Sequence, residues 1–125
     1  MSLDRIHEQH QQLELLSRQL CQRINRPPFD YESLDSAILE LIHLYRRHFI
    51  YEEVQMAKSA YPDYQQHKKL HGQFLSRLQT AFQQWQETRE YRVLKHVFSD
   101  SLIMDLEAHL SDSDQHLIDH LSTQD

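Results

Sequence analysis

The sequence predicts an all-α protein, folded as an antiparallel, up-and-down four-helix bundle with metal ligands in its core. The chain has one glycine and three prolines in 125 residues, which favours a few long helices over many short strands. Apolar residues recur at alternating steps of three and four, the spacing of residues that share one face of a helix. The prolines fall between these periodic stretches, so the loops are short and neighbouring helices are expected to be antiparallel.

Composition limits the class of protein. The length indicates one domain over residues 1–125, and the formal net charge of −6 without a basic stripe argues against a nucleic-acid partner. No apolar run approaches the ~18 residues of a membrane span, so no membrane partner is expected. The single Cys21 cannot form an internal disulfide, which makes the cytoplasm the expected location. We expect Cys21 to have no chemical role.

The first helix is expected from Leu3 to Ile24. It should end there because Pro27 and Pro28 follow, and proline disfavours helix at its own position and at the preceding residue. Its inward positions are Leu3, Ile6, His10, Leu13, Ser17, Leu20 and Ile24.

The second helix is expected to start near Asp30 to Ser33, either of which could cap it, and to end before Pro62. Its inward positions are Leu34, Ile38, Leu41, Tyr45, His48 and Glu52, then Gln55 or Met56.

The third helix should begin near Asp63. It contains Gly72, which costs about 1 kcal/mol relative to alanine inside a helix, so we expect a neighbouring helix to approach closely there. The polar stretch Gln86 to Glu90 is expected to form the next turn. The inward positions of this helix are Tyr64, His67, His71, Phe74, Leu78, Ala81 and Trp85.

The fourth helix is expected from Tyr91 to Leu121, with Ser99-Asp100 as an alternative start. Its inward stripe is Phe98, Leu102, Leu106, Leu110, Leu117 and Leu121.

Ligand-capable residues lie on the inward faces of all four predicted helices. His48 and Glu52 are four residues apart, as are His67 and His71, so each pair can hold one ion from a single helix. Five imidazoles and two carboxylates are too many for one tetrahedral zinc and suit two iron ions with bridging carboxylates. Ligand type alone leaves zinc, copper and nickel open. The other candidate ligands are His10, His109 and one of the two carboxylates Asp112 and Asp114.

The alternative to a metal site is a set of ordinary core histidines. A single inward histidine is more often hydrogen-bonded than metal-bound. Five buried imidazoles and a buried glutamate without metal, however, would leave many polar groups unsatisfied, so the metal hypothesis is preferred. The remaining histidines are expected on the surface, and Tyr45, Tyr51 and Tyr64 are expected to serve packing. These surface histidines are His7, His43, His96, His116 and His120.

Four motifs together resemble those of the hemerythrin family in its bacterial form. One lies on each predicted helix, and the resemblance covers almost the whole chain. The motifs read Glu8-Gln9-His10, His48-Phe49-Ile50-Tyr51-Glu52-Glu53, His67-Lys68-Lys69-Leu70-His71 and His109-Leu110-Ser111-Asp112-Ser113-Asp114.

The resemblance implies a role for each ligand. His67, His71 and His109 would hold one iron, and His10 and His48 would hold the other. Glu52 and Asp114 would bridge the two ions together with a solvent-derived oxo or hydroxo group. The iron with two histidines would keep an open position, where members of this family bind dioxygen reversibly. By their positions, Leu13, Phe49 and Leu106 are expected to form the wall of the oxygen pocket.

The last carboxylate ligand has two candidates. His109 and Asp114 are five residues apart, about 140° around an ideal helix, whereas Asp112 lies three residues away and closer to the His109 face. The family spacing favours Asp114, so we expect Asp114 to bind metal, with a local π-type irregularity between it and His109.

Three functional classes are compatible with such a site. The first is an oxygen-binding module, and the second is a sensory domain attached to an output domain such as a diguanylate cyclase or a chemotaxis receptor. The third, a di-iron oxidase or peroxidase, is disfavoured because ferritin-like enzymes need two Glu-x-x-His motifs and this chain has only Glu40 to His43. We therefore expect no enzymatic activity in this domain itself.

Overall fold

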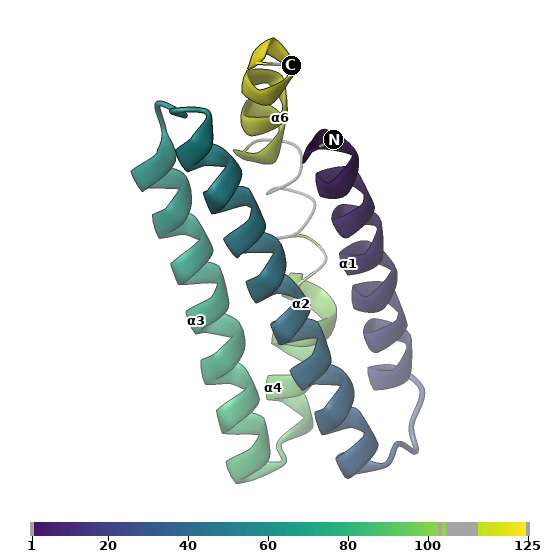
Figure 1. The fold of residues 1–125 in the computed structure, drawn as a ribbon. Coiled ribbons are helices and arrows are strands. Elements are labelled where there is room, and N and C mark those ends of the chain that lie inside the picture. The colour runs from purple at the N-terminus through teal and green to yellow at the C-terminus, as the bar shows by residue number, and fades with distance from the viewer. Residues whose placement is uncertain (1, 103, 105–112, 125) are drawn as a thin grey trace.

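The computed structural model describes the backbone of residues 2–102, 104 and 113–124, and the side chains of residues 4–102, 104 and 115–123. Three long helices lie side by side (Figure 1): α1 (Ser2–Ile24), α2 (Tyr31–Lys58) and α3 (Tyr64–Thr88). A further segment contains the short α4 (Tyr91–Lys95), the π-helix η1 (His96–Ser101) and α6 (Ser113–Gln124). The described residues form helices and no strand, which confirms the all-α class.

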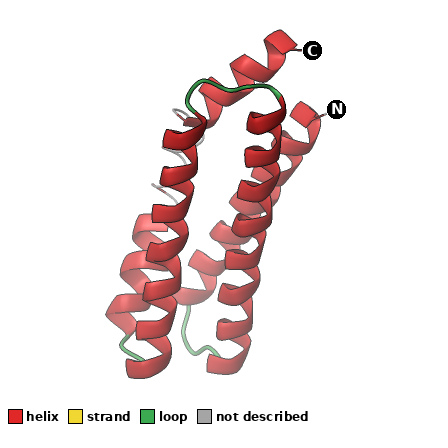
Figure 2. Ribbon diagram, turned by 60° about the vertical axis from the view of Figure 1, so that its left-hand side comes forward, coloured by secondary structure: helices red, strands yellow, loops and turns green. Residues whose placement is uncertain are grey.

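The connections are short and lie at opposite ends of the bundle. Figure 2 shows the α1–α2 and α3–α4 loops at one end and the α2–α3 loop at the other, beside both termini. Successive helices among α1, α2, α3 and α4 therefore run in opposite directions. No helix in the described part of the chain is long and apolar enough to cross a membrane.

The predicted helix starts agree with the structure. Asp30 caps α2, and its carboxylate accepts a hydrogen bond from the backbone N–H of Ser33 at 3.0 Å. This bond satisfies one of the donors that the first turn of a helix leaves unpaired. Asp63 precedes α3, as expected, although its side chain forms no capping bond.

The turn expected at Gln86 to Glu90 lies within that range but is confined to Arg89 and Glu90, because α3 continues to Thr88. The helix ends where Arg89 takes a left-handed conformation (φ 53°) and its N–H donates to the carbonyl of Trp85. Trp85 is buried in the core and keeps the last turns of α3 on the bundle. Packing of this residue therefore outweighs the polar character of the residues that follow it.

The fourth segment starts at Tyr91, as predicted, and the alternative start at Ser99-Asp100 was wrong because these residues lie inside η1. The wider turn of a π-helix inserts an extra residue. Phe98 and Ser99, adjacent in sequence, are both buried here, and the Ser99 hydroxyl accepts a hydrogen bond from Asn25 at 2.7 Å. The π-type irregularity expected between His109 and Asp114 lies mostly outside the described residues.

The apolar core has two parts. The larger cluster occupies the half of the bundle with two loops and includes Leu13, Phe49 and Phe74. The smaller cluster, near the termini, contains Ile6, Met56, Tyr61, Leu117 and Leu121. Along α1, α2 and α3, the inward histidines fall between residues of the two clusters, so a buried polar layer is enclosed by apolar packing on both sides.

An ion-pair cluster lies at the end of the bundle that holds the α1–α2 and α3–α4 loops. Arg89 donates to both carboxylate oxygens of Asp35 at 2.8 Å, and the indole N–H of Trp85 donates to Asp35 at 2.9 Å. The hydrogen bond from Arg89 lowers the pKa of Asp35, and burial partly opposes this effect. The cluster joins α2 to the residue that ends α3.

We predict that Asp35→Asn lowers the free energy of unfolding by about 2 kcal/mol near neutral pH, because a charge-assisted bidentate pair is lost. A carboxylate with a lowered pKa stabilises the fold above its unfolded pKa, and this contribution disappears as the pH falls through the folded pKa. Urea denaturation at several pH values should therefore show the two proteins converging in acid. A difference that stays constant into strong acid would contradict this role.

The close helix approach expected at Gly72 was also wrong. A Cβ built on Gly72 meets no heavy atom within 4 Å, and the residue is exposed. Its φ is not positive, so nothing in the backbone requires glycine.

Gly72→Ala should therefore stabilise the protein by about 1 kcal/mol, the difference in helix propensity between the two residues. Thermal unfolding should show a higher midpoint than for the original sequence. A lower midpoint would mean that an unrecognised contact depends on the missing Cβ.

Candidate metal centre

Five predicted ligands meet in the buried polar layer. His10 comes from α1, His48 and Glu52 from α2, and His67 and His71 from α3, and none is more than 8% exposed. The spacing of four residues places each pair on α2 and α3 on one helix face. The helices therefore bring together five nitrogen- and oxygen-bearing side chains that solvent scarcely reaches.

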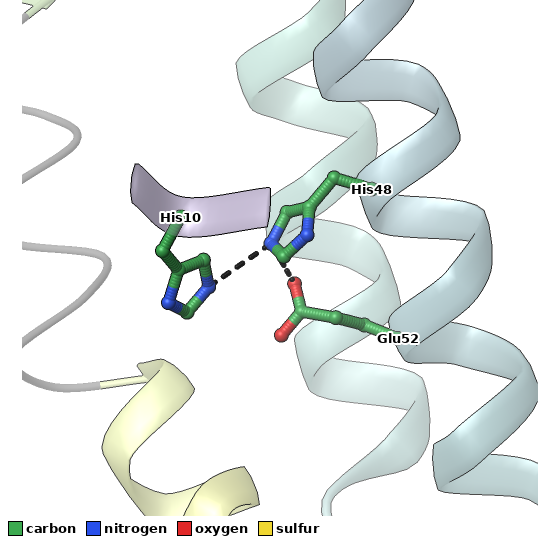
Figure 3. A group of neighbouring side chains, drawn as sticks. All are labelled: His10, His48 and Glu52. Atoms are coloured by element: carbon green, nitrogen blue, oxygen red, sulfur yellow. Dashed lines mark hydrogen bonds and ion pairs between the residues drawn. The ribbon is translucent and has the colours of Figure 1, made fainter. Parts of the chain in front are cut away.

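Three of these residues form a first ligand group. The Nε2 atoms of His10 and His48 lie 3.1 Å apart, and the His48 Nε2 lies 2.8 Å from the Oε1 of Glu52. Figure 3 shows the three side chains turned toward one another from α1 and α2. Candidate ligand atoms of all three residues lie within 4.8 Å of one another, which is close enough for a single ion.

A second group contains Glu52, His67 and His71, whose ligand atoms also lie within 4.8 Å of one another. The Nε2 of His71 is 3.6 Å from the same Oε1 of Glu52 that faces His48. The imidazole rings of His67 and His71 are perpendicular, with centroids 4.5 Å apart. Glu52 therefore belongs to both groups, a position that fits a carboxylate shared by two ions.

The outward nitrogens of two histidines have partners of different charge. The Nδ1 of His48 donates to the amide oxygen of Gln9 at 2.7 Å, and the Nδ1 of His71 donates to the carboxylate of Glu53 at 3.0 Å. Burial raises the pKa of Glu53, while the charges of Lys68 and His67 act in the opposite direction. A proton held on Nδ1 makes Nε2 the unprotonated ring nitrogen, which is the form that can bind a metal.

Two of the three residues predicted to form the wall of the oxygen pocket lie in the described part of the chain. Phe49 is buried and stacks on the His71 ring, with centroids 3.9 Å apart and an interplanar angle of 9°. Leu13 is buried in the same cluster. Leu106, the third predicted pocket residue, lies outside the described residues.

The remaining predicted ligands are not placed by the structure. His109 and Asp112 lie outside the described residues, and the side chain of Asp114, at the start of α6, is not described either. The preference for Asp114 over Asp112 thus stays a prediction.

The histidines expected on the surface are exposed at His7, His43, His96 and His116. The expectation was wrong for His120, which is half-buried. Its Nε2 donates to the carbonyl of Ser59 at 3.0 Å, and its ring packs against Tyr61. His120 therefore joins α6 to the loop between α2 and α3.

Fold and site together define a class: a helical bundle that holds cations through histidine and carboxylate side chains. The chain matches the family model described as the hemerythrin HHE cation binding domain over residues 1–121 and belongs to the hemerythrin family. Comparison with curated proteins found no match, and neither did comparison with solved structures. The donor set of imidazole nitrogens and a shared carboxylate fits the cation binding of this family.

We predict that Glu52→Gln reduces metal binding from two ions to one or none, because an amide is a poor replacement for a shared anionic ligand. Metal content after loading with iron or zinc and gel filtration measures the stoichiometry. Glu40→Gln, an exposed carboxylate on the same helix, is the matched control and should leave the stoichiometry unchanged. Two tightly bound ions in the Glu52→Gln protein would contradict the shared role.

Proposed function

We propose that this chain is an antiparallel four-helix di-iron domain that binds dioxygen reversibly, as an oxygen-binding or oxygen-sensing module in the cytoplasm. The observation that best supports the proposal is the position of Glu52, whose carboxylate belongs to two separate groups of histidines on three helices. A carboxylate shared between two histidine groups can bind two neighbouring metal ions, as in the di-iron carboxylate proteins.

In this proposal the ligands divide unequally between the ions. His10 and His48 hold one iron, and His67 and His71, together with His109, hold the other. Glu52 and Asp114 would be ligands of both irons, and a solvent-derived oxo or hydroxo group would complete the centre. Iron held by these residues would supply the electrons for reversible binding of dioxygen, and the ligand group with fewer histidines would leave room for dioxygen to bind.

The protein side chains control access to this centre. The apolar clusters above and below the ligands limit the entry of water and protons. We propose that Leu13 and Phe49, with Leu106, line the space in which dioxygen is held. Phe49 also fixes the orientation of the His71 ring by stacking on it.

The proposal assigns binding rather than catalysis to this domain. Glu40 and His43, the only Glu-x-x-His pair, are both exposed and lie away from the ligand groups, which disfavours a ferritin-like oxidase. A sensory domain joined to an output domain would use the same site. The sequence of the full-length gene distinguishes that case from a free-standing oxygen-binding protein.

Optical spectra of the iron-loaded protein test the function directly. The ferrous protein should be nearly colourless under anaerobic conditions, gain a visible charge-transfer band on exposure to dioxygen, and lose it again when dioxygen is removed. Azide added to the oxidised protein should give a different band. Absence of any di-iron spectrum after iron reconstitution would contradict the proposal, and an irreversible loss of the ferrous form on the first exposure would contradict reversible binding.

A further inference from the structure

Two ligand histidines, His48 and His71, donate outward-facing hydrogen bonds to acceptors of different charge. Gln9 on α1 accepts from His48 on α2, and Glu53 on α2 accepts from His71 on α3. Each bond crosses between two helices and engages a different ligand group, because His48 belongs to the His10 group and His71 to the His67 group. The acceptor is a neutral amide in the first case and a carboxylate in the second.

This difference changes the donor strength of the two imidazoles. A carboxylate attracts the Nδ1 proton more strongly than an amide does, and the electron density released makes Nε2 a better ligand. The Glu53 side chain is only 20% exposed, so solvent screens the interaction weakly. The charge of Lys68 on α3 acts on Glu53 and opposes the effect of burial on its pKa.

We propose that Gln9 and Glu53 are positioning residues that give the two metal positions unequal affinities. Glu53 strengthens the binding of the ion at His67 and His71. Gln9 holds the His48 ring in the same orientation without adding charge, which leaves the ion at His10 and His48 more weakly bound. The inference rests on the proposed two-metal site and deepens it, since it concerns how the same ligands are tuned.

A zinc titration followed by nitrogen-15 NMR of the histidine side chains tests the inference, because zinc is diamagnetic and each ring reports its own ion. Glu53→Gln should raise the dissociation constant of the ion at His67 and His71 by about 10- to 100-fold, the usual effect of losing an outer partner of a metal ligand. The ion at His10 and His48 should change little. Glu40→Gln, an exposed carboxylate on the same helix, is the control.

The converse variant separates electronic tuning from a structural tether. Gln9→Glu should lower the dissociation constant of the ion at His10 and His48. The double variant Gln9→Glu, Glu53→Gln should reduce the ratio of the two dissociation constants more than either single substitution does. A purely structural role predicts that every substitution weakens the binding of both ions and lowers the melting temperature. That result, or no change in either ion, would overturn the inference.

The wild-type titration distinguishes the inference from the proposed function. If the wild-type protein binds fewer than two zinc ions at these histidines, both the two-metal function and the inference fail. If it binds two ions but Glu53→Gln shifts both constants equally, the two-metal site stands and only the unequal tuning is overturned.

Discussion

The fold depends on how it accommodates one buried carboxylate. Glu52 is fully buried, and its surroundings are imidazole rings from three helices. An isolated carboxylate in an apolar interior costs many kcal/mol and is tolerated only when cations or strong donors compensate for it. Metal cations shared with the histidines would provide this compensation, and the stability of the core would then depend on the occupancy of the site.

The rest of the structure holds this polar layer in place. Apolar clusters pack on both sides of it. The outward ring nitrogens of His48 and His71, which lie beside Glu52, are hydrogen-bonded to Gln9 and Glu53. The far end of the bundle is joined separately by the ion pair of Asp35 and Arg89. The buried polar layer thus lies between the two apolar clusters, whereas this ion pair joins α2 to the end of α3.

Much of the fold follows from periodicity. The inward faces of α1, α2 and α3 could be predicted because steps of three and four residues identify one face of a helix without knowledge of its neighbours. Predictions failed where a distant contact decides the outcome. The burial of Trp85 keeps α3 helical through the polar residues that follow it. Gly72 lacks the neighbouring helix that its sequence suggested, and His120 donates to the distant carbonyl of Ser59.

The same division applies to the site. His48, Glu52, His67 and His71 could be found from their spacing, because a helix alone places them together. Gln9 and Glu53 could not be assigned, although each adjoins a ligand in the sequence, because only helix packing determines which outward nitrogen meets which acceptor. The π-helix η1 was missed for a similar reason, since the part-buried hydrogen bond between Asn25 and Ser99 joins distant parts of the chain.

The most direct test of the shared carboxylate is anomalous diffraction at the iron absorption edge from crystals of the iron-loaded protein. The account predicts two anomalous peaks, one on each side of the Glu52 carboxylate, the first beside His10 and His48 and the second beside His67 and His71. A single peak, or two peaks of which only one contacts Glu52, would contradict it.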